Sequence, residues 1–148
     1  MTIQGLLDKV NTVDLRSAVP QLIIKTKADA VLLNQLQLYQ FGMTAADKKV
    51  GEYKNKYYAA KKHAKNPQPG FGVVDLADTR DFYNGFTLAV TKTTFEFDSK
   101  DSKSDKLIDQ YGEKIFGLGA ESKTKYSTGT LLPAIQKYIT GKTGLQFT

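Results

Sequence analysis

The 148-residue sequence contains no cysteine, a single histidine and only two arginines. The lack of cysteine excludes disulfide bonds, thiolate chemistry and zinc sites that need thiolate ligands. No apolar run approaches the roughly 18 residues that a membrane-spanning helix needs. The first ten residues also lack the basic start and the long apolar stretch of a signal peptide. We therefore expect a protein that is kept in the cytoplasm or is released with a particle built there.

The length of the chain is that of one domain, which can bury enough surface to fold without cross-links. Its hydrophobic fraction of 41% and charged fraction of 24% are ordinary for a globular protein, so composition favours no unusual class. We expect one domain over residues 1–148 with a flexible basic segment near 43–72. Within that segment, the proline- and glycine-containing run 66–70 is the best candidate for a mobile connection.

The net charge of +6 is unevenly distributed along the chain. Residues 1–65 contain eleven Lys and Arg against five Asp and Glu, residues 66–118 contain six against nine, and residues 119–148 contain four against one. Such asymmetry suits a protein that docks between unlike surfaces or stacks on copies of itself. The alternative is that the lysines only keep an α+β domain in solution.

Apolar residues spaced by three and four positions predict helices at the start of the chain. Thr2 is expected to cap a first, short helix. Thr12 or Asp14 is expected to cap a longer amphipathic helix that begins at Leu15. Gly42 is a plausible end for this longer helix, because glycine readily adopts the left-handed conformation found at helix ends.

Alternating apolar and polar residues predict a β-hairpin in the middle of the chain. Its strands should lie within residues 82–90 and 94–98. The face predicted to be buried carries five apolar side chains, namely Phe86, Leu88, Val90, Phe95 and Phe97. Helices that include Leu22, Ile23 and Leu36 are expected to cover this face.

Two more helices are predicted after the hairpin. Ser104 should cap a helix over 105–111 that Gly112 interrupts. A last helix should cover 131–139, with Pro133 in its first turn. Together these elements predict an α+β fold, in which N-terminal helices pack on a small antiparallel β-sheet and C-terminal helices follow.

The sequence contains no grouping of residues that is typical of catalysis or metal binding. His63 stands among lysines without ligand partners at metal-binding spacing, so we interpret it as a surface residue without a role. The run 98–105 lacks the central glycine and the final glutamate of a calcium loop. The run 117–123 lacks the second glycine of a phosphate-binding loop. We therefore expect no enzymatic activity, no cofactor and no metal site.

One candidate binding segment remains, the lysine- and tyrosine-rich run 48–65. Lysines contact phosphates and tyrosines stack on bases, so binding to single-stranded nucleic acid is conceivable. The scarcity of arginine argues against specific base reading, and the alternative is that the tyrosines pack inward beneath the lysine stems. The candidates for contact with a partner or with DNA are Lys48, Lys49, Lys54, Lys56, Lys61, Lys62 and Lys65, with Lys100 and Lys103 from the next polar loop.

Four segments of the chain resemble small virion proteins of tailed bacteriophages. They are QLQLYQFG at 35–42, YKNKYYAAKKHAKN at 53–66, VDLADTRDFYNGFTLAV at 74–90 and FEFDSKDSKSDKLIDQYGEKIFGL at 95–118. The most similar group is the tail-completion or head–tail joining proteins of phages and prophages of Bacteroidetes-type hosts. In that group a leucine-threonine-glycine element leads into a strand pair, and a later helix ends in tyrosine-glycine. Here Leu76, Thr79 and Tyr111-Gly112 match, whereas Arg80 stands where the group has glycine.

The resemblance implies a non-enzymatic neck or tail subunit of a virion, assembled in the host cytoplasm. It also implies several partners: copies of the same chain in a homo-oligomeric ring (a hexamer or dodecamer), the portal or connector protein, and tail-tube or tail-terminator proteins. Non-specific contact with DNA in the channel is expected, and contact with a membrane is not. The alternative function is a small basic nucleic-acid-binding protein that uses residues 48–65. The segments expected to dock on neighbouring chains are 43–72, 99–104 and the tail from Gly141.

Overall fold

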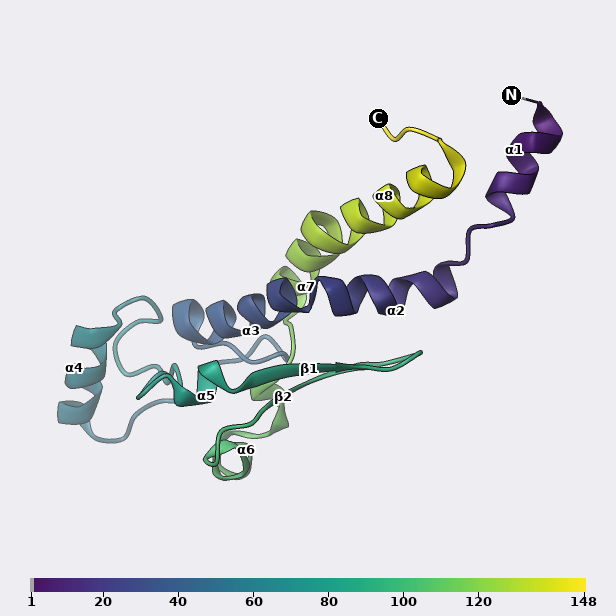
Figure 1. Ribbon diagram of the computed structural model, residues 1–148. Helices are drawn as coiled ribbons and strands as arrows, with labels where there is room; N and C mark the ends of the chain where they lie inside the picture. The colour runs from purple at the N-terminus through teal and green to yellow at the C-terminus, as the bar shows by residue number, and fades with distance from the viewer. Residues whose placement is uncertain (1) are drawn as a thin grey trace.

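The computed structural model describes residues 2–148 and consists mainly of helices around one β-hairpin (Figure 1). The elements before the hairpin are α1 (Ile3–Val10), α2 (Leu15–Lys25), α3 (Lys27–Phe41), α4 (Lys56–Lys65) and the short α5 (Asp81–Asn84). The hairpin consists of β1 (Phe86–Val90) and β2 (Phe95–Ser99). The elements after it are α6 (Ser104–Tyr111), a 3₁₀ turn (Glu113–Ile115), α7 (Ala120–Tyr126), a π-helical turn (Ser127–Leu131) and α8 (Leu132–Thr143). The predicted α+β class, with helices at both ends of the chain and a small antiparallel sheet, is confirmed.

The predicted helix ends near the N-terminus are confirmed. Thr2 Oγ1 accepts a hydrogen bond from the Gly5 N–H at 3.0 Å, which caps α1. Asp14 Oδ1 accepts one from the Ser17 N–H at 3.3 Å, which caps α2. At the end of α3, Gly42 adopts the left-handed conformation with φ of 59°. These caps satisfy backbone groups that a helix leaves without partners at its ends.

The long helix predicted from Leu15 is interrupted at Thr26, where the backbone leaves helical geometry with φ of −107° and ψ of 11°. The Thr26 hydroxyl donates to the Leu22 carbonyl oxygen at 2.8 Å and shares a hydrogen bond of 2.8 Å with the hydroxyl of Tyr126. A threonine that bonds back to its own helix bends it. The contact with Tyr126 comes from a distant part of the chain, so α2 and α3 are separated by a tertiary interaction.

Two amide side chains on the buried face of α3 hold the segment that follows the 3₁₀ turn. Asn34 Nδ2 donates to the Ile115 carbonyl oxygen at 3.1 Å, and Asn34 Oδ1 accepts from the Gly117 N–H at 2.9 Å. Gln37 Oε1 accepts from the Gly119 N–H at 2.7 Å. The carbonyl lies at the end of the 3₁₀ turn and the two N–H groups follow that turn, so the amides supply hydrogen-bond partners that no helix or strand ladder provides.

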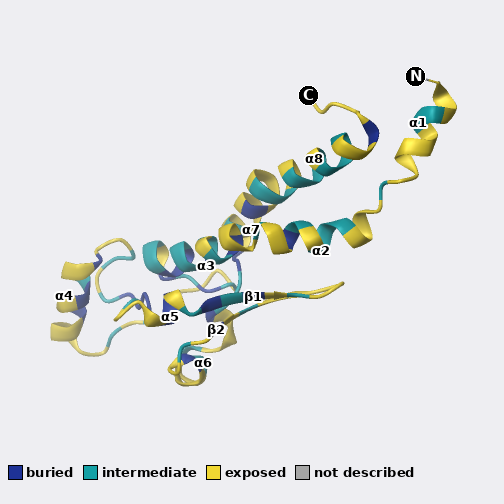
Figure 2. Ribbon diagram, viewed as in Figure 1, coloured by how far each residue is buried: buried dark blue, intermediate teal, exposed yellow. Residues whose placement is uncertain are grey.

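The hairpin pairs antiparallel, with Leu88 opposite Phe97 and Val90 opposite Phe95. The predicted alternation is confirmed at its base, where Phe86 and Leu88 are buried. The prediction that Phe95 is buried is wrong, because 43% of this residue is exposed. The far end of the hairpin is solvent-exposed (Figure 2). α2 runs alongside it, and a hollow lies between the start of α2 and residues 90–95.

Buried side chains form two groups in the core. The larger group consists of Leu38, Val50, Val74, Leu76, Phe82, Tyr83, Phe86 and Ile115. The smaller group consists of Ile23, Ala30, Leu88, Leu118 and Tyr126. Of the three helix residues expected to cover the hairpin, only Ile23 belongs to these groups, whereas Leu22 and Leu36 are half-buried.

The chain is helical from Ala120 to Thr143, which is much longer than the predicted helix over 131–139. The π-helical turn lies just before Pro133. Proline has no N–H to donate to the preceding turn, and a π-helical turn accommodates such a local departure from α-helical hydrogen bonding. The first turn of α7 is held by a distant side chain, because the Ala120 N–H donates to Asp47 Oδ1 at 3.1 Å. The start of this helix therefore depends on tertiary structure.

The segments expected to dock on other chains are partly built into the body. Val50, Ala59 and Asn66 are buried, so the segment 43–72 does not lie outside the core as expected. In the loop 99–104, the last residue begins α6 instead of capping it, and its hydroxyl is buried without a hydrogen-bond partner among residues 2–148. In the C-terminal tail, Thr143 still belongs to α8 and is buried.

Replacing Ile115 with alanine should lower the free energy of unfolding by about 2–5 kcal/mol, because this fully buried side chain would leave a cavity. Replacing Phe95 with alanine should cost less than about 2 kcal/mol, because its ring is already partly in water. Urea unfolding followed by circular dichroism measures both values. Equal losses for the two variants would show that the hairpin tip is packed as tightly as the core.

Candidate functional site

A buried ion pair joins α4 to the segment between α4 and α5. Lys62 Nζ lies 3.0 Å from Asp75 Oδ1, and the two side chains are only 7% and 3% exposed. Lys62 Nζ also donates to the Ala77 carbonyl oxygen at 3.0 Å. Ala59 is the only other buried residue of α4. The buried face of this helix therefore consists of one small apolar side chain and one charged side chain.

Further hydrogen bonds converge on the same carboxylate. Asn66 Nδ2 donates to Asp75 Oδ2 at 2.9 Å and to the Tyr39 carbonyl oxygen at 2.8 Å, which connects the end of α4 to α3. The Tyr83 hydroxyl donates to the main-chain oxygen of Asp75. The Tyr53 hydroxyl lies 3.5 Å from Asp75 Oδ1. Asp75 therefore connects α3, α4, α5 and the chain that precedes α4.

This network changes the protonation behaviour of its members. Burial alone would raise the pKa of Asp75, but hydrogen bonds from the Ala77 N–H, Asn66 and Lys62 lower it below its usual range. Burial, followed by the charge of Asp75, raises the pKa of Tyr53. Burial likewise raises the pKa of Tyr111. The phenols therefore stay neutral at physiological pH and can donate hydrogen bonds.

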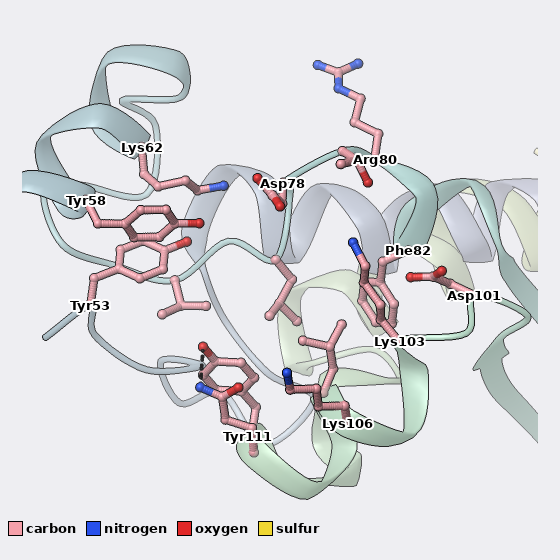
Figure 3. Close-up of a pocket in the computed structure, with 15 residues that line it drawn as sticks. Tyr53, Tyr58, Lys62, Asp78, Arg80, Phe82, Asp101, Lys103, Lys106 and Tyr111 are labelled. Atoms are coloured by element: carbon pink, nitrogen blue, oxygen red, sulfur yellow. Dashed lines mark hydrogen bonds between the residues drawn. The ribbon is translucent and has the colours of Figure 1, made fainter. Parts of the chain in front are cut away.

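A cavity of about 400 Å³, here called the tyrosine cavity, opens beside the ion pair between α4, α6 and the segment before α5. Its apolar floor is formed by Val74, Leu76, Phe82 and Leu107. Its polar lining consists of Tyr53, Tyr58, Lys62, Asp78, Thr79, Arg80, Asp101, Lys103, Lys106, Gln110 and Tyr111. Figure 3 shows the Tyr53 and Tyr58 rings on one side, Lys103 and Lys106 on the other, and the Arg80 guanidinium directed away from the cavity.

Two residues of the lining have backbone conformations that side chains disfavour. The φ angles of Leu76 and Arg80 are 57° and 68°. Only one other non-glycine residue of the described chain, Asp47, has positive φ. The conformation at Arg80 is one that glycine would adopt easily and that a side chain makes costly. Strain of this kind tends to gather at functional sites.

The structure corrects one member of the predicted set of contact lysines. Lys62 is buried and paired with Asp75, so it does not belong to an exposed basic surface. The other eight are exposed: Lys48, Lys49, Lys54, Lys56, Lys61, Lys65, Lys100 and Lys103. They do not form one surface, because Lys103 lines the tyrosine cavity and Lys100 lies by a separate hollow along β1. The expected basic surface is therefore limited to α4 and the chain before it.

The predicted position of His63 on the surface is only partly correct. Its ring is half-buried and packs edge-to-face on Phe71, with ring centroids 5.7 Å apart. Within residues 2–148, no group of three or more histidine, cysteine, aspartate or glutamate side chains is arranged to hold a metal ion. No helix in the same range is long and apolar enough to cross a membrane.

The sequence contains a signal for the buried ion pair that composition alone does not reveal. Asp75 interrupts the apolar run from Val73 to Leu76, and a buried carboxylate requires a cation or several donors. Ala59, Lys62 and Asn66 then fall on one face of α4, which marks that face as the one directed inward. The tyrosine cavity has no comparable local signal, because its walls come from three separate parts of the chain.

Comparisons of the chain with protein-family models, with curated proteins and with solved structures find no match.

Replacing Asp75 with asparagine should destabilise the protein by about 3–5 kcal/mol, because it leaves the Lys62 charge buried without its counter-ion. The double variant Lys62→Met, Asp75→Asn should lose less than the sum of the two single variants. The exposed pair Lys125–Glu121, 2.8 Å apart, is the control, and Lys125→Met should cost less than about 1 kcal/mol. Additive losses at Lys62 and Asp75 in denaturant titrations would contradict the ion pair.

The same carboxylate should make the stability of the protein depend on pH. Its pKa is lower in the folded than in the unfolded state, so its contribution is present above the unfolded value and is lost as pH falls through the folded value. Between about pH 5 and pH 2 the wild type should therefore lose more unfolding free energy than the double variant Lys62→Met, Asp75→Asn. Parallel pH profiles for the two proteins would show that Asp75 titrates normally.

Proposed function

We propose that this chain is a non-enzymatic structural subunit of a tailed-bacteriophage virion. In this proposal it is a neck or tail-completion protein that forms a homo-oligomeric ring and joins the portal or connector to the tail. The observation that carries the self-assembly part of the proposal is the uncovered apolar face of α1. None of the eight residues of α1 is buried, and Ile3 is 82% exposed.

The apolar residues of α1 lie on one side of the helix. Ile3, Leu6, Leu7 and Val10 follow the spacing of three and four that places side chains on a common face. The helix contacts α8 within the same chain, yet Leu7 and Val10 remain exposed. A short helix gains most of its stability from packing an apolar face, so contact with another chain is the natural use of this surface.

More uncovered apolar surface lies on the elements around α1. Both termini lie at the same end of the molecule, where α1 and α8 project beyond the hairpin and the α4 region (Figure 1). The exposed apolar side chains of these terminal elements and the start of α2 are Ile3, Leu7, Val10, Leu15, Leu132, Leu145 and Phe147. We name this set the terminal apolar surface. We infer that these side chains together form an interaction site, because exposed apolar areas on a protein surface are typical of one.

The hairpin offers a second place for contact with another chain. Within residues 2–148, β1 and β2 pair only with each other, so both outer edges have free backbone groups. An unpaired edge can accept a strand from a neighbouring chain. Beside it, a hollow of about 410 Å³ is lined by Phe95, Phe97, Phe116 and Leu131, with Lys114 and Lys123 as its charged residues. An extended hairpin and a projecting apolar end suit a subunit that contacts neighbours on two sides.

The placement in a phage neck or tail is supported by the resemblance over residues 35–118. The matching segments are not confined to the core. They include the chain around α4, the strand pair and the helix that ends at Tyr111. The tyrosine-glycine element makes a helix end, because Gly112 follows α6 with φ of 88°. These positions support a shared fold with the virion proteins, and self-assembly is the property to test first.

A second candidate function has one specific observation in its favour. Tyr57 is 90% exposed on α4, close in sequence to the exposed Lys54, Lys56 and Lys61. An exposed tyrosine among lysines can stack on a base while the lysines contact phosphates. A salt-dependent shift of single-stranded DNA, weakened in Lys56→Glu, Lys61→Glu, would support nucleic-acid binding.

The double variant Ile3→Glu, Leu7→Glu should block or strongly weaken self-association. Each of these side chains contributes about 1.5–3 kcal/mol when it is buried against a neighbour. Light scattering coupled to size-exclusion chromatography measures the mass of wild type and variant at equal concentrations. The wild type should elute as a multiple of the 16.4 kDa chain, and the variant should shift towards a folded monomer.

Lys9→Glu is the matched control, because it changes the net charge by the same two units on the polar side of the same helix. It should assemble like the wild type. If the wild type stays monomeric at every concentration, or if Lys9→Glu disrupts assembly as much as the double variant, then α1 is not the assembly surface.

A further inference from the structure

We infer that the tyrosine cavity binds a nucleoside phosphate, either as a free nucleotide or as one unpaired nucleotide of a single strand. This inference does not depend on the proposed virion role and concerns a different surface from the terminal apolar surface. It rests on the size of the cavity, its aromatic wall, its lysines and two carboxylates that have no hydrogen-bond donor among residues 2–148.

The cavity has the size and the wall that a base needs. Its volume of about 400 Å³ is near the lower end of small-molecule sites and suits one nucleotide, not a duplex. Tyr53 and Tyr58 pack edge-to-face with ring centroids 5.1 Å apart, and Tyr111 completes the wall (Figure 3). Gln110 Nε2 donates to the Tyr111 hydroxyl at 3.1 Å, which fixes this ring. Aromatic rings stack on bases of any type.

The opposite side of the cavity supplies positive charge. Lys103 and Lys106 are three residues apart at the start of α6, so both side chains project from the same side of the helix. Neither forms an ion pair with another residue of the described chain. Lysine ammonium groups bind phosphate as point charges, and an ammonium without a carboxylate partner is free to do so.

The two carboxylates of the lining distinguish a nucleotide from a simple anion. Asp78 and Asp101 accept no hydrogen bond through their carboxylates from any of residues 2–148, and Asp101 Oδ2 is buried. A buried carboxylate oxygen without a donor is costly, so a donor from a ligand would stabilise it. Figure 3 shows Asp78 near the Tyr58 side and Asp101 near Lys103.

A ligand for this cavity must therefore combine three properties. It needs an aromatic body for the tyrosines, a negative group for the lysines, and N–H or O–H donors for the two carboxylates. An inorganic anion would be repelled by the carboxylates, and a simple cation would be repelled by the lysines. In a nucleoside phosphate the base stacks on the tyrosines and its exocyclic amine reaches Asp78. The ribose hydroxyls reach Asp101, and the phosphate contacts Lys103 and Lys106.

Adenosine 5′-monophosphate is the first probe, because adenine carries an exocyclic amine. The chain contains no tryptophan, so ligand binding can be followed through tyrosine fluorescence and confirmed by calorimetry. We expect saturable binding that weakens for adenosine, which lacks the phosphate, and for inosine 5′-monophosphate, which has a carbonyl oxygen in place of the amine. Inorganic phosphate alone should not displace the nucleotide at equal concentration.

Variants of the two surfaces distinguish nucleotide binding in the cavity from binding on the exposed face of α4. Lys103→Gln, Lys106→Gln should weaken binding about tenfold or more, because two charge-assisted contacts with phosphate are lost. Tyr58→Leu should weaken it about fivefold or more, whereas Tyr58→Phe, which keeps the ring, should bind like the wild type. Lys56→Gln, Lys61→Gln is the matched control outside the cavity and should leave binding unchanged.

A short single-stranded oligoadenylate of ribonucleotides, which keeps the 2′-hydroxyl, distinguishes the two sources of the nucleotide. If it binds more tightly than the mononucleotide and is weakened by the same variants, the cavity takes one nucleotide of a strand. If it does not compete with the mononucleotide, the cavity takes the free nucleotide. The inference is overturned if adenosine 5′-monophosphate does not bind at millimolar concentration. It is also overturned if the cavity variants and the α4 control bind equally well.

Discussion

The buried ion pair between Lys62 and Asp75 is the contact on which the position of α4 and the tyrosine cavity depend. α4 is rich in lysine, and its only buried residues are Ala59 and Lys62. Hydrophobic contact alone therefore contributes little to the packing of this helix on the rest of the protein. The carboxylate of Asp75 holds α4 in place through its ion pair with Lys62. Asn66 bonds to the same carboxylate and to the Tyr39 carbonyl oxygen, which links α4 to α3. A buried ion pair is a poor source of net stability but a strong constraint on arrangement, because any other packing leaves a charge unpaired.

That constraint has consequences on both sides of α4. On the inner side it places Tyr53 and Tyr58 opposite α6 and so creates the tyrosine cavity. On the outer side it leaves Tyr57 and most of the lysines in water. The lysine- and tyrosine-rich segment 48–65 thus has three parts. Lys62 is a buried structural residue, Tyr53 and Tyr58 form a wall of the cavity, and the remaining lysines form an exposed basic surface.

Local features of the fold were predictable from the sequence, whereas features that depend on distant contacts were not. The caps at Thr2 and Asp14 and the alternation in the hairpin are properties of neighbouring residues, and these predictions are confirmed. The break at Thr26 requires Tyr126, and the start of α7 requires Asp47, each from far along the chain. The burial of Lys62 was not predicted, because the local sequence does not distinguish it from the neighbouring lysines. Only the tertiary contact with Asp75 does so. The exposure of Phe95 depends on how closely α2 packs on the far end of the hairpin, which the alternation of residues does not encode.

The ion pair and the amides of α3 hold the core elements of the fold together. The terminal apolar surface and the open hairpin are attached to this core. We propose that these two features contact other copies of the chain, as the surfaces of a symmetric assembly do. Native mass spectrometry of the wild-type protein over a series of concentrations tests this claim most directly. Our account predicts one discrete species whose mass is a fixed multiple of the 16.4 kDa chain, as a closed ring requires. A monomer at all concentrations, or a continuous ladder of masses without a preferred size, would contradict it.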